Sequence, residues 1–277
     1  MQQNARQSAV DDPLLQEICL DNCRQSLFER LLRWERKCGR TDFIGILRKQ
    51  GRMHPDIAEF PNRMFYAHER LEPVPLPHQE EATISYQEPS EDTVDDRLKA
   101  HRVLFIDTTA PAREGSGEAV EAVIVADLLR RIHRFYGAHF DARKTVGVIV
   151  PYRSQIASVR RELEKLGIPA LQDITIDTVE RYQGSQRDVI IYSFTVQKHY
   201  QLDFLTANRF EEDGQTIDRK LNVAITRARC QLLMTGNGQI LRSDSVFREL
   251  LRFTEKRDAV LSATDFFPVS DRCCIFG

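Results

Sequence analysis

Short segments that are apolar at nearly every position alternate along this chain with helical patterns. The segments Val103–Ile106, Val146–Val150 and Val189–Phe194 have this apolar character, and amphipathic helical patterns cover Glu118–Phe135 and Ser154–Leu166. A strand that is apolar on both faces must be covered on both faces, and its alternation with helices is typical of parallel sheets. We therefore predict an α/β fold in which helices cover both faces of a parallel sheet.

The same patterns continue on either side. We expect further strands at Ile174–Val179 and Gln231–Thr235, and further helices at Leu221–Ala228 and Ser245–Thr254. The chain of 277 residues is long enough for one large domain or two small ones.

The amino-terminal part carries clear local signals. Ser26 followed by Glu29 is a capping box, which predicts a helix that begins there and ends at Gly39. The apolar run Phe43–Leu47 predicts a short strand, and Pro55 suits the first turn of another helix.

Charge is unevenly distributed. The whole chain has 39 Lys and Arg against 41 Asp and Glu, a net charge of −2. The segment Glu72–Ala100 holds eight acidic and two basic residues, or −6, which leaves +4 for the remainder. We expect a solvated loop, with a partner-docking segment as the alternative. Four prolines should interrupt any regular element there: Pro73, Pro75, Pro77 and Pro89.

Several classes of protein are excluded by what the sequence lacks. No uncharged apolar run approaches the roughly 20 residues that a membrane span needs. Met1–Val10 carries no secretory pattern, and the six cysteines form no Cys-x-x-Cys pair. We expect a cytoplasmic, reducing location, no contact with a membrane and no metal site. Cys19 and Cys23 are expected to be small buried side chains, with a metal site as the alternative.

The chain also lacks a P-loop, the glycine-rich segment that cradles nucleotide phosphates. Gly115-Ser-Gly is followed by Glu118 where that motif requires Lys, and no Rossmann glycine pattern occurs. We therefore expect that this chain does not hold a nucleotide by itself.

Four polar stretches stand beside predicted strands: Gln50–Pro55 (QGRMHP), Val150–Gln155 (VPYRSQ), Asp177–Asp188 (DTVERYQGSQRD) and Leu221–Arg229 (LNVAITRAR). Function in parallel sheets is expected in loops after the carboxyl ends of strands. Taken singly, each stretch also has a plain structural explanation. Arginines can bind phosphate or be solvated, and Ser154 can favour an anion at a helix start or be a simple N-cap.

In this order, the four stretches resemble the second RecA-like domain of superfamily 1B helicases, the branch of the nonsense-mediated-decay and Okazaki-fragment-processing helicases. The matches extend from Ser26 to about Asn237. The resemblance implies a RecA-like domain at residues 26–257, with an acidic excursion at about 72–100. It also implies a lead-in from a preceding domain at residues 1–25 and a tail at 258–277.

The resemblance implies roles for individual residues. Arg227 would be an arginine finger and Arg52 a second phosphate contact, both catalytic, on ATP and Mg²⁺ held mainly by an absent first domain. Asn222 and Thr226 would position the finger helix. The implied ATP-binding residues are Gln183, Gly184, Gln186, Arg227 and Arg52, and the implied nucleic-acid-binding residues are Tyr152, Arg153, Ser154, Thr178 and Asn222.

Two positions depart from the family pattern. Gly51 stands where the family has an aromatic residue that packs on the base, and Gln186 stands where it has Glu. We expect modified selectivity for the nucleotide base. The implied function is the motor half of an ATP-dependent DNA or RNA helicase, with single-stranded nucleic acid and the first RecA-like domain as partners and no ATPase activity in this chain alone. The alternatives are a degenerate binding module without hydrolysis and an unrelated α/β domain.

Overall fold

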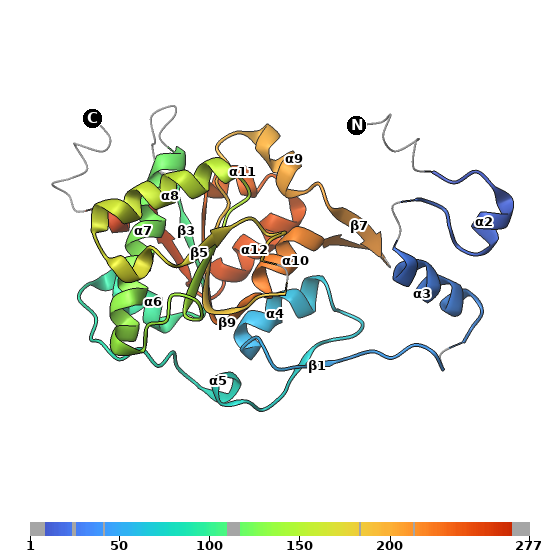
Figure 1. Ribbon diagram of the computed structural model, residues 1–277, viewed down its shortest axis with the longest axis horizontal. Helices are drawn as coiled ribbons and strands as arrows, with labels where there is room; N and C mark the ends of the chain where they lie inside the picture. The colour runs from blue at the N-terminus through green and yellow to red at the C-terminus, as the bar shows by residue number, and fades with distance from the viewer. Residues whose placement is uncertain are drawn as a thin grey trace. The chain divides into compact units, whose positions relative to one another are not determined.

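The computed structural model describes residues 9–23, 26–40, 42–109, 117–182, 184–212 and 214–267. These residues form two compact units, Met1–Leu47 and Arg48–Gly277, which are drawn together in Figure 1 and described separately below.

The described residues of the first unit include the helices α2 (Pro13–Glu17) and α3 (Leu27–Lys37). The predicted capping of α3 is confirmed, because the Ser26 hydroxyl accepts a hydrogen bond from the Glu29 amide at 3.1 Å. The predicted strand at Phe43–Leu47 is wrong. These residues are not in a strand, and the Leu47 side chain is 90% exposed. An apolar run forms a strand only where a neighbouring strand pairs with it, and here the pairing begins later, at β1 (Lys49–Gln50).

The second unit is built on a six-stranded sheet in which every neighbouring pair is parallel. The strand order is β10-β3-β9-β6-β4-β5, which confirms the predicted α/β fold with a parallel sheet. The strands are β3 (Val103–Asp107), β4 (Val146–Ile149), β5 (Thr175–Asp177), β6 (Arg187–Ser193), β9 (Ala228–Gly236) and β10 (Val260–Ser262). The edge strand β10 lies inside the segment that we expected to be a tail.

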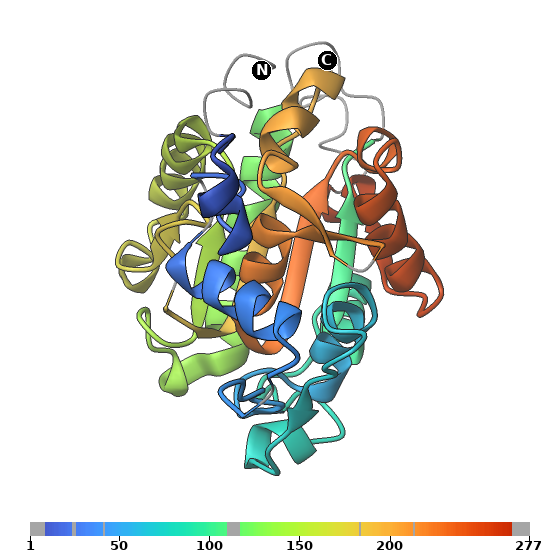
Figure 2. The same cartoon turned by 90° about the vertical axis from the view of Figure 1, so that its right-hand side faces the viewer.

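Helices cover both faces of this sheet, and each face has its own apolar core. On one face α7 (Gly117–Tyr136) and α8 (Arg153–Leu166) pack through residues such as Leu128 and Leu163. On the other face, α12 (Ser245–Glu255) packs through Phe247 and its neighbours. Figure 2 shows α8 and α12 on opposite sides of the strands. This two-sided burial is the reason why the strands are apolar at nearly every position.

The remaining elements are short. α4 (Pro55–Met64) and α10 (Arg219–Ile225) share the face of α12. An antiparallel hairpin, β7 with β8, precedes α10, and its turn includes Gly214 at a φ of +78°. Sequence patterns did not lead us to predict it. The other elements are β2 (Glu72–Pro73), β7 (Arg209–Glu212), β8 (Gln215–Asp218), α5 (Pro77–Glu80), α9 (Leu202–Leu205), α11 (Gly238–Leu241), η1 (Gly137–His139), η2 (Pro169–Leu171), η3 (His199–Gln201) and η4 (Ala263–Phe266).

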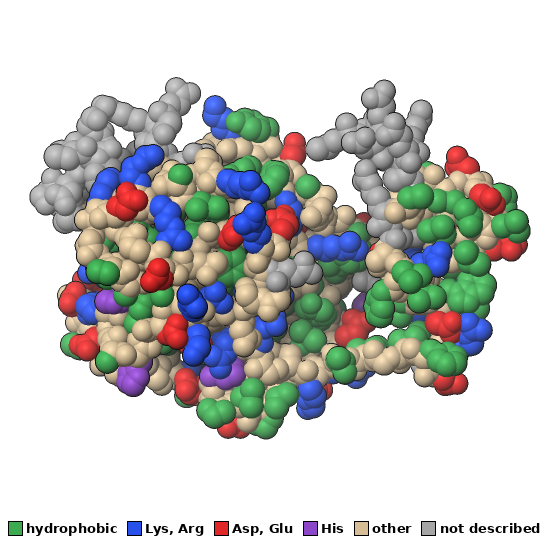
Figure 3. Space-filling view, in the orientation of Figure 1, with side chains coloured by type: hydrophobic (Ala, Val, Ile, Leu, Met, Phe, Trp, Pro, Cys, Tyr) green, Lys and Arg blue, Asp and Glu red, His purple; other side chains and the backbone are tan. Residues whose placement is uncertain are grey.

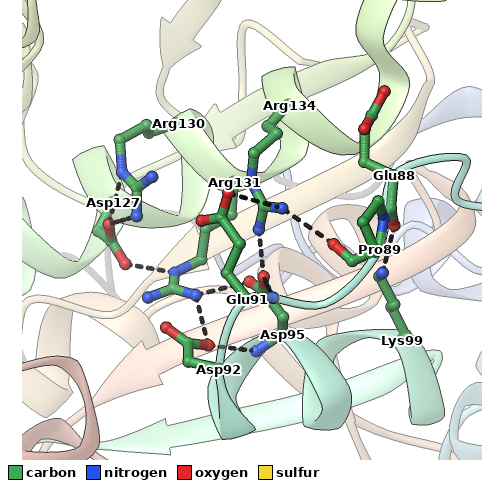
Figure 4. A network of polar contacts seen from close by, with 10 residues as sticks. All are labelled: Glu88, Pro89, Glu91, Asp92, Asp95, Lys99, Asp127, Arg130, Arg131 and Arg134. Carbon is green, nitrogen blue, oxygen red and sulfur yellow. Dashed lines mark hydrogen bonds and ion pairs between the residues drawn. The ribbon is translucent and has the colours of Figure 1, made fainter.

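The acidic segment differs from the expected solvated loop without regular structure. It contains α6 (Thr93–Ala100), whose Asp95 is fully buried and bonds to both Arg131 and Arg134 of α7. Figure 4 shows this network, in which Arg131 also bonds to Asp92 at 2.8 Å and to Asp127 at 2.6 Å. Positions three apart on a helix share a face, so α7 presents its arginines together to the acidic segment.

Candidate nucleotide and nucleic-acid sites

The predicted site residues lie at two opposite edges of the parallel sheet. Gln186 and Arg227 directly precede β6 and β9, so they lie at the amino ends of these strands. Thr178 follows β5 and Tyr152 lies just beyond β4, at the carboxyl ends. The predicted ATP-binding group therefore lies at the amino edge and not at the carboxyl edge, where we expected function. The long loop between β5 and β6 connects the two edges.

At the amino edge, Arg52 meets the predicted ATP-binding residues. Its Nε donates to Gln186 Oε1 at 3.0 Å, and its Nη1 donates to the Thr226 carbonyl at 3.1 Å. Arg52, which is far from Arg227 in the sequence, thus contacts the residue that directly precedes Arg227. Figure 3 shows Lys and Arg side chains on both the upper and the lower part of this face of the second unit.

Arg227 is half-buried and is held by neutral oxygen atoms. Its Nε donates to the Val223 carbonyl at 3.0 Å, and its terminal nitrogens lie 3.4 Å from the Ser185 carbonyl and from Thr226 Oγ1. Burial and the nearby charge of Arg52 lower the pKa of the Arg227 guanidinium. Among the described residues, no carboxylate pairs with Arg52 or Arg227. An arginine pair without a counter-charge favours an anion.

A set of amide groups holds the loop that carries Arg52. Gln50 Oε1 accepts from the backbone amides of Arg52 and Met53 at 2.9 and 2.8 Å. The buried Gln79 donates to the carbonyls of Gln50 and Met53, and His78 Nε2 lies 2.9 Å from the Arg52 carbonyl. The sequence singled out none of these supporting residues of α5, because they lie in a proline-rich segment without a periodic pattern.

The other predicted nucleotide residues have simpler surroundings. Gly184 is exposed at a φ of +88°, a conformation that favours glycine. Gln183 lies outside the described residues. At Gly51, an added Cβ would lie 3.2 Å from Leu76 Cδ1, so a leucine from the α5 segment packs where a side chain would begin.

The carboxyl edge brings together most of the predicted nucleic-acid residues. Tyr152 is the N-cap of α8, and Arg153 and Ser154 are exposed in its first turn. The N-cap role considered for Ser154 is therefore wrong. Thr178 is half-buried, and its amide donates to Asp177 Oδ1 at 2.8 Å. The Tyr152 hydroxyl donates to the Gln201 carbonyl at 3.1 Å.

Asn222 belongs to a different environment. Its Nδ2 donates to the Tyr66 hydroxyl at 2.9 Å, and its Oδ1 is buried without a hydrogen bond within the described part of the chain. It lies on α10, the helix that leads to Arg227. Among the described contacts, none joins Asn222 to Tyr152 or Thr178.

The sequence analysis missed two residues at the carboxyl edge, Phe204 and Lys220. The ring of Phe204 lies 4.9 Å from that of Tyr152, and Lys220 Nζ lies 3.9 Å from the Phe204 ring centre. Lys220 also pairs with Glu180 at 3.5 Å. The only signal for Phe204 in the sequence was an aromatic residue in a polar segment. This signal does not indicate at which end of the strands the side chain lies.

Comparisons with known proteins show the family of this chain. A family model described as an AAA domain matches residues 23–239. The chain belongs to this family. It is the C-terminal, second RecA-like region of a superfamily 1B helicase.

Named relatives of this helicase region come from distant organisms. The chain is 31% identical to helicase sen1 of Schizosaccharomyces pombe, over 83% of this chain and 12% of that protein. It is 28% identical to an uncharacterized ATP-dependent helicase of Methanocaldococcus jannaschii, over 85% of this chain and 32% of that protein. It is also 28% identical to a regulator of nonsense transcripts 1 homolog of Drosophila melanogaster, over 87% of this chain and 19% of that protein. The chain thus spans a third or less of these relatives.

Long apolar helices are missing from the described part of this helicase region. None of its helices has the length and hydropathy needed to cross a membrane.

Proposed function

We propose that this chain is the second motor domain of an ATP-dependent DNA or RNA helicase. Arg227 acts as an arginine finger and Arg52 as a second phosphate contact, on ATP and Mg²⁺ held mainly by a first RecA-like domain. Tyr152, Arg153 and Thr178 contact the backbone of a single strand. Without a P-loop, the chain alone has no ATPase activity, and its cytoplasmic location remains a prediction.

One observation carries this proposal. Arg52 and Arg227 are both half-buried and hydrogen-bond only to neutral oxygen atoms within the described residues, and burial together with the charge of Arg52 lowers the pKa of Arg227. By contrast, the half-buried Arg229 pairs with Asp188 at 2.6 Å. Bringing a phosphate between the two arginines relieves their repulsion, and the residues present therefore fit a triphosphate.

The two arginines support catalysis by charge. Negative charge spreads over the transferred phosphoryl group in the transition state, and an arginine finger accelerates such reactions by about 10³–10⁵-fold. Arg227 directly precedes β9, so it moves with the sheet when the whole domain moves as a rigid body. Closure of the two domains would bring it to the phosphate, and opening would remove it.

The test is ATP hydrolysis by the full-length parent protein, with and without single-stranded DNA or RNA. We expect a single strand to stimulate turnover, and Arg227→Ala to lower it by at least about 10³-fold. Arg252→Ala is a matched control, because Arg252 is exposed on α12 and bonds to Glu249. Turnover that survives Arg227→Ala, or robust turnover by the 277-residue chain alone, would contradict the proposal.

The alternative function is a degenerate module that binds nucleic acid or a protein without hydrolysis. Two departures from the family pattern, Gly51 and Gln186, favour it. The Oε1 atom of Gln186 already accepts a hydrogen bond from Arg52. The same experiment separates the two functions. A parent protein that binds single strands without hydrolysing ATP would establish the alternative.

A further inference from the structure

We propose that Phe204 and Tyr200, on the helical segment η3–α9, form a stacking platform for the bases of single-stranded nucleic acid, next to Tyr152. This inference rests on the proposed function, because it names how the carboxyl edge would hold its strand. None of the sequence motifs includes this segment.

The two rings are exposed on one side of an anchored segment. Tyr200 is 68% exposed and Phe204 is 44% exposed, whereas Leu202 and Leu205 between and beside them are buried in the core. Positions four apart in a helical segment lie on the same side. Burial of the leucines holds the backbone, and the rings project away from the core.

Hydrogen bonds fix this segment in place. Gln201 Oε1 accepts from the amides of Gln197 and Lys198 at 2.7 and 2.8 Å, which closes the turn before η3. The Tyr152 hydroxyl donates to the Gln201 carbonyl, and its ring lies against Phe204 with planes tilted by 30°. Less conformational entropy is lost when a ligand binds to rings that are already ordered.

Two cations of different exposure lie beside the rings. Lys220 is buried, and it holds Phe204 in place, because its Nζ lies over the ring, donates to the Phe204 carbonyl and pairs with Glu180. Arg153 is exposed at the start of α8, directly after Tyr152. Figure 1 shows α8 and α9 at the upper edge of the sheet, opposite α4 and α5.

This combination suits a nucleic-acid strand of any sequence. Every base has a π-face that can stack on an aromatic ring, and phosphates are bound by nearby cations. We therefore expect binding with little sequence preference.

The test measures binding of the 277-residue chain to oligo(dT) and to oligo(U) without nucleotide. Stacking contributes enough that Phe204→Ala should weaken affinity by about 5- to 100-fold, and Tyr200→Ala should also weaken it. Phe204→Leu keeps an apolar side chain but has no ring, and it should bind as weakly as Phe204→Ala. Phe204→Trp keeps an aromatic ring at this position, so its affinity should be as high as that of the wild-type chain. Phe28→Ala, which removes a 77% exposed ring from α3, should have no effect.

A second readout reports stacking directly. Trp34 is the only tryptophan in the chain, so a Trp34→Phe, Phe204→Trp double variant places the sole tryptophan on the platform. Its fluorescence should be quenched when a single strand binds. Melting temperatures of the variants check that each one folds.

Each outcome has a definite meaning. Unchanged affinity of Phe204→Ala and Tyr200→Ala, or loss that Phe204→Trp does not restore, overturns the platform and leaves the proposed helicase function standing. No binding of any strand by the wild-type chain overturns the platform and also the predicted strand contacts at the carboxyl edge. The effect of Arg227→Ala on ATP hydrolysis by the parent protein tests the nucleotide half independently.

Discussion

The side chain of Arg52 donates a hydrogen bond to the backbone carbonyl of Thr226 at 3.1 Å. This bond ties the loop after β1 to the turn that carries Arg227, although the two segments are far apart in the sequence. The hydroxyl of the same threonine lies 3.4 Å from the Arg227 guanidinium. One residue thus sets the spacing of two cations, and a change that moves either loop should change how both meet a phosphate.

Gln79→Ala should lower the proposed ATPase activity of the parent protein without removing either proposed phosphate contact. The Gln79 amide donates to the carbonyls of Gln50 and Met53, and its loss would loosen the loop around Arg52. Misplacing a group by about 1 Å can cost roughly 100-fold in rate, and we expect about a tenfold loss of strand-stimulated ATPase activity. Steady-state kinetics should assign the loss to kcat. Gln239→Ala, an exposed glutamine on α11, is the control, and equal activity of the two variants would contradict this positioning role.

Asp95→Asn should destabilise the fold strongly. The carboxylate is fully buried and pairs with Arg131 at 2.6 Å and with Arg134. Asp95→Asn weakens charge-assisted hydrogen bonds to both arginines, which contribute about 1.5–3 kcal/mol each, while Arg131 keeps its bonds to Asp92 and Asp127. Urea unfolding would measure the loss. Asp141→Asn breaks only the exposed pair with Lys144 and should cost less than about 1 kcal/mol, so a similar effect of both variants would rule out this account.

The same network predicts how stability depends on pH. Burial alone would raise the pKa of the Asp95 carboxyl, but hydrogen bonds from the Glu91 amide and from two arginines outweigh it and hold that pKa below its usual value. A carboxyl whose pKa is lowered in the folded state contributes fully to the free energy of unfolding at pH values above its unfolded-state pKa of about 3.9. This contribution is lost as the pH falls further. The stability difference between wild type and Asp95→Asn should therefore be constant from pH 7 to about pH 5 and shrink below about pH 4. Urea midpoints across this range would reveal it, and a difference that grows on acidification would be inconsistent with the network.

Gly147→Ala should destabilise the sheet by about 1–3 kcal/mol through overpacking. Gly147 lies inside β4, and a methyl group there would overlap the Tyr182 hydroxyl, which donates to the Thr175 carbonyl at 2.6 Å. Tyr182→Phe removes that oxygen, so it should partly rescue Gly147→Ala in a double variant. Thermal or urea unfolding of all four proteins gives the coupling energy. Simple additivity of the two substitutions would show that the clash is not the cause.

Local sequence patterns predicted much of the fold, because the helices and strands that they indicate depend on residues that are neighbours in the sequence. The helix over Ser154–Leu166 was predicted from its apolar face and its terminal glycine, and the structure has α8 at Arg153–Leu166 with Gly167 at a φ of +65°. The strand at Val146–Val150 was predicted because both faces are apolar, and β4 spans Val146–Ile149. Such signals failed at Phe43–Leu47, where the same composition occurs without a pairing strand.

The acidic segment shows what a charge pattern in the sequence does not predict. Its composition indicated a solvated loop, yet Asp95 is fully buried beneath two arginines of α7. A run of like charges is solvated only when no opposite charges face it, and the sequence does not say which segments face one another.

The sequence by itself determined the parallel α/β fold, the helicase family and the identities of the candidate arginines. These follow from periodicity and from motifs, which are local properties of the chain. Only the tertiary structure decided that Arg52 and Arg227 lie together, with no carboxylate paired to either among the described residues, and that Phe204 lies against Tyr152 at the other edge. Both relationships depend on how strands from distant segments are ordered in the sheet, and that order is set by packing of the whole core.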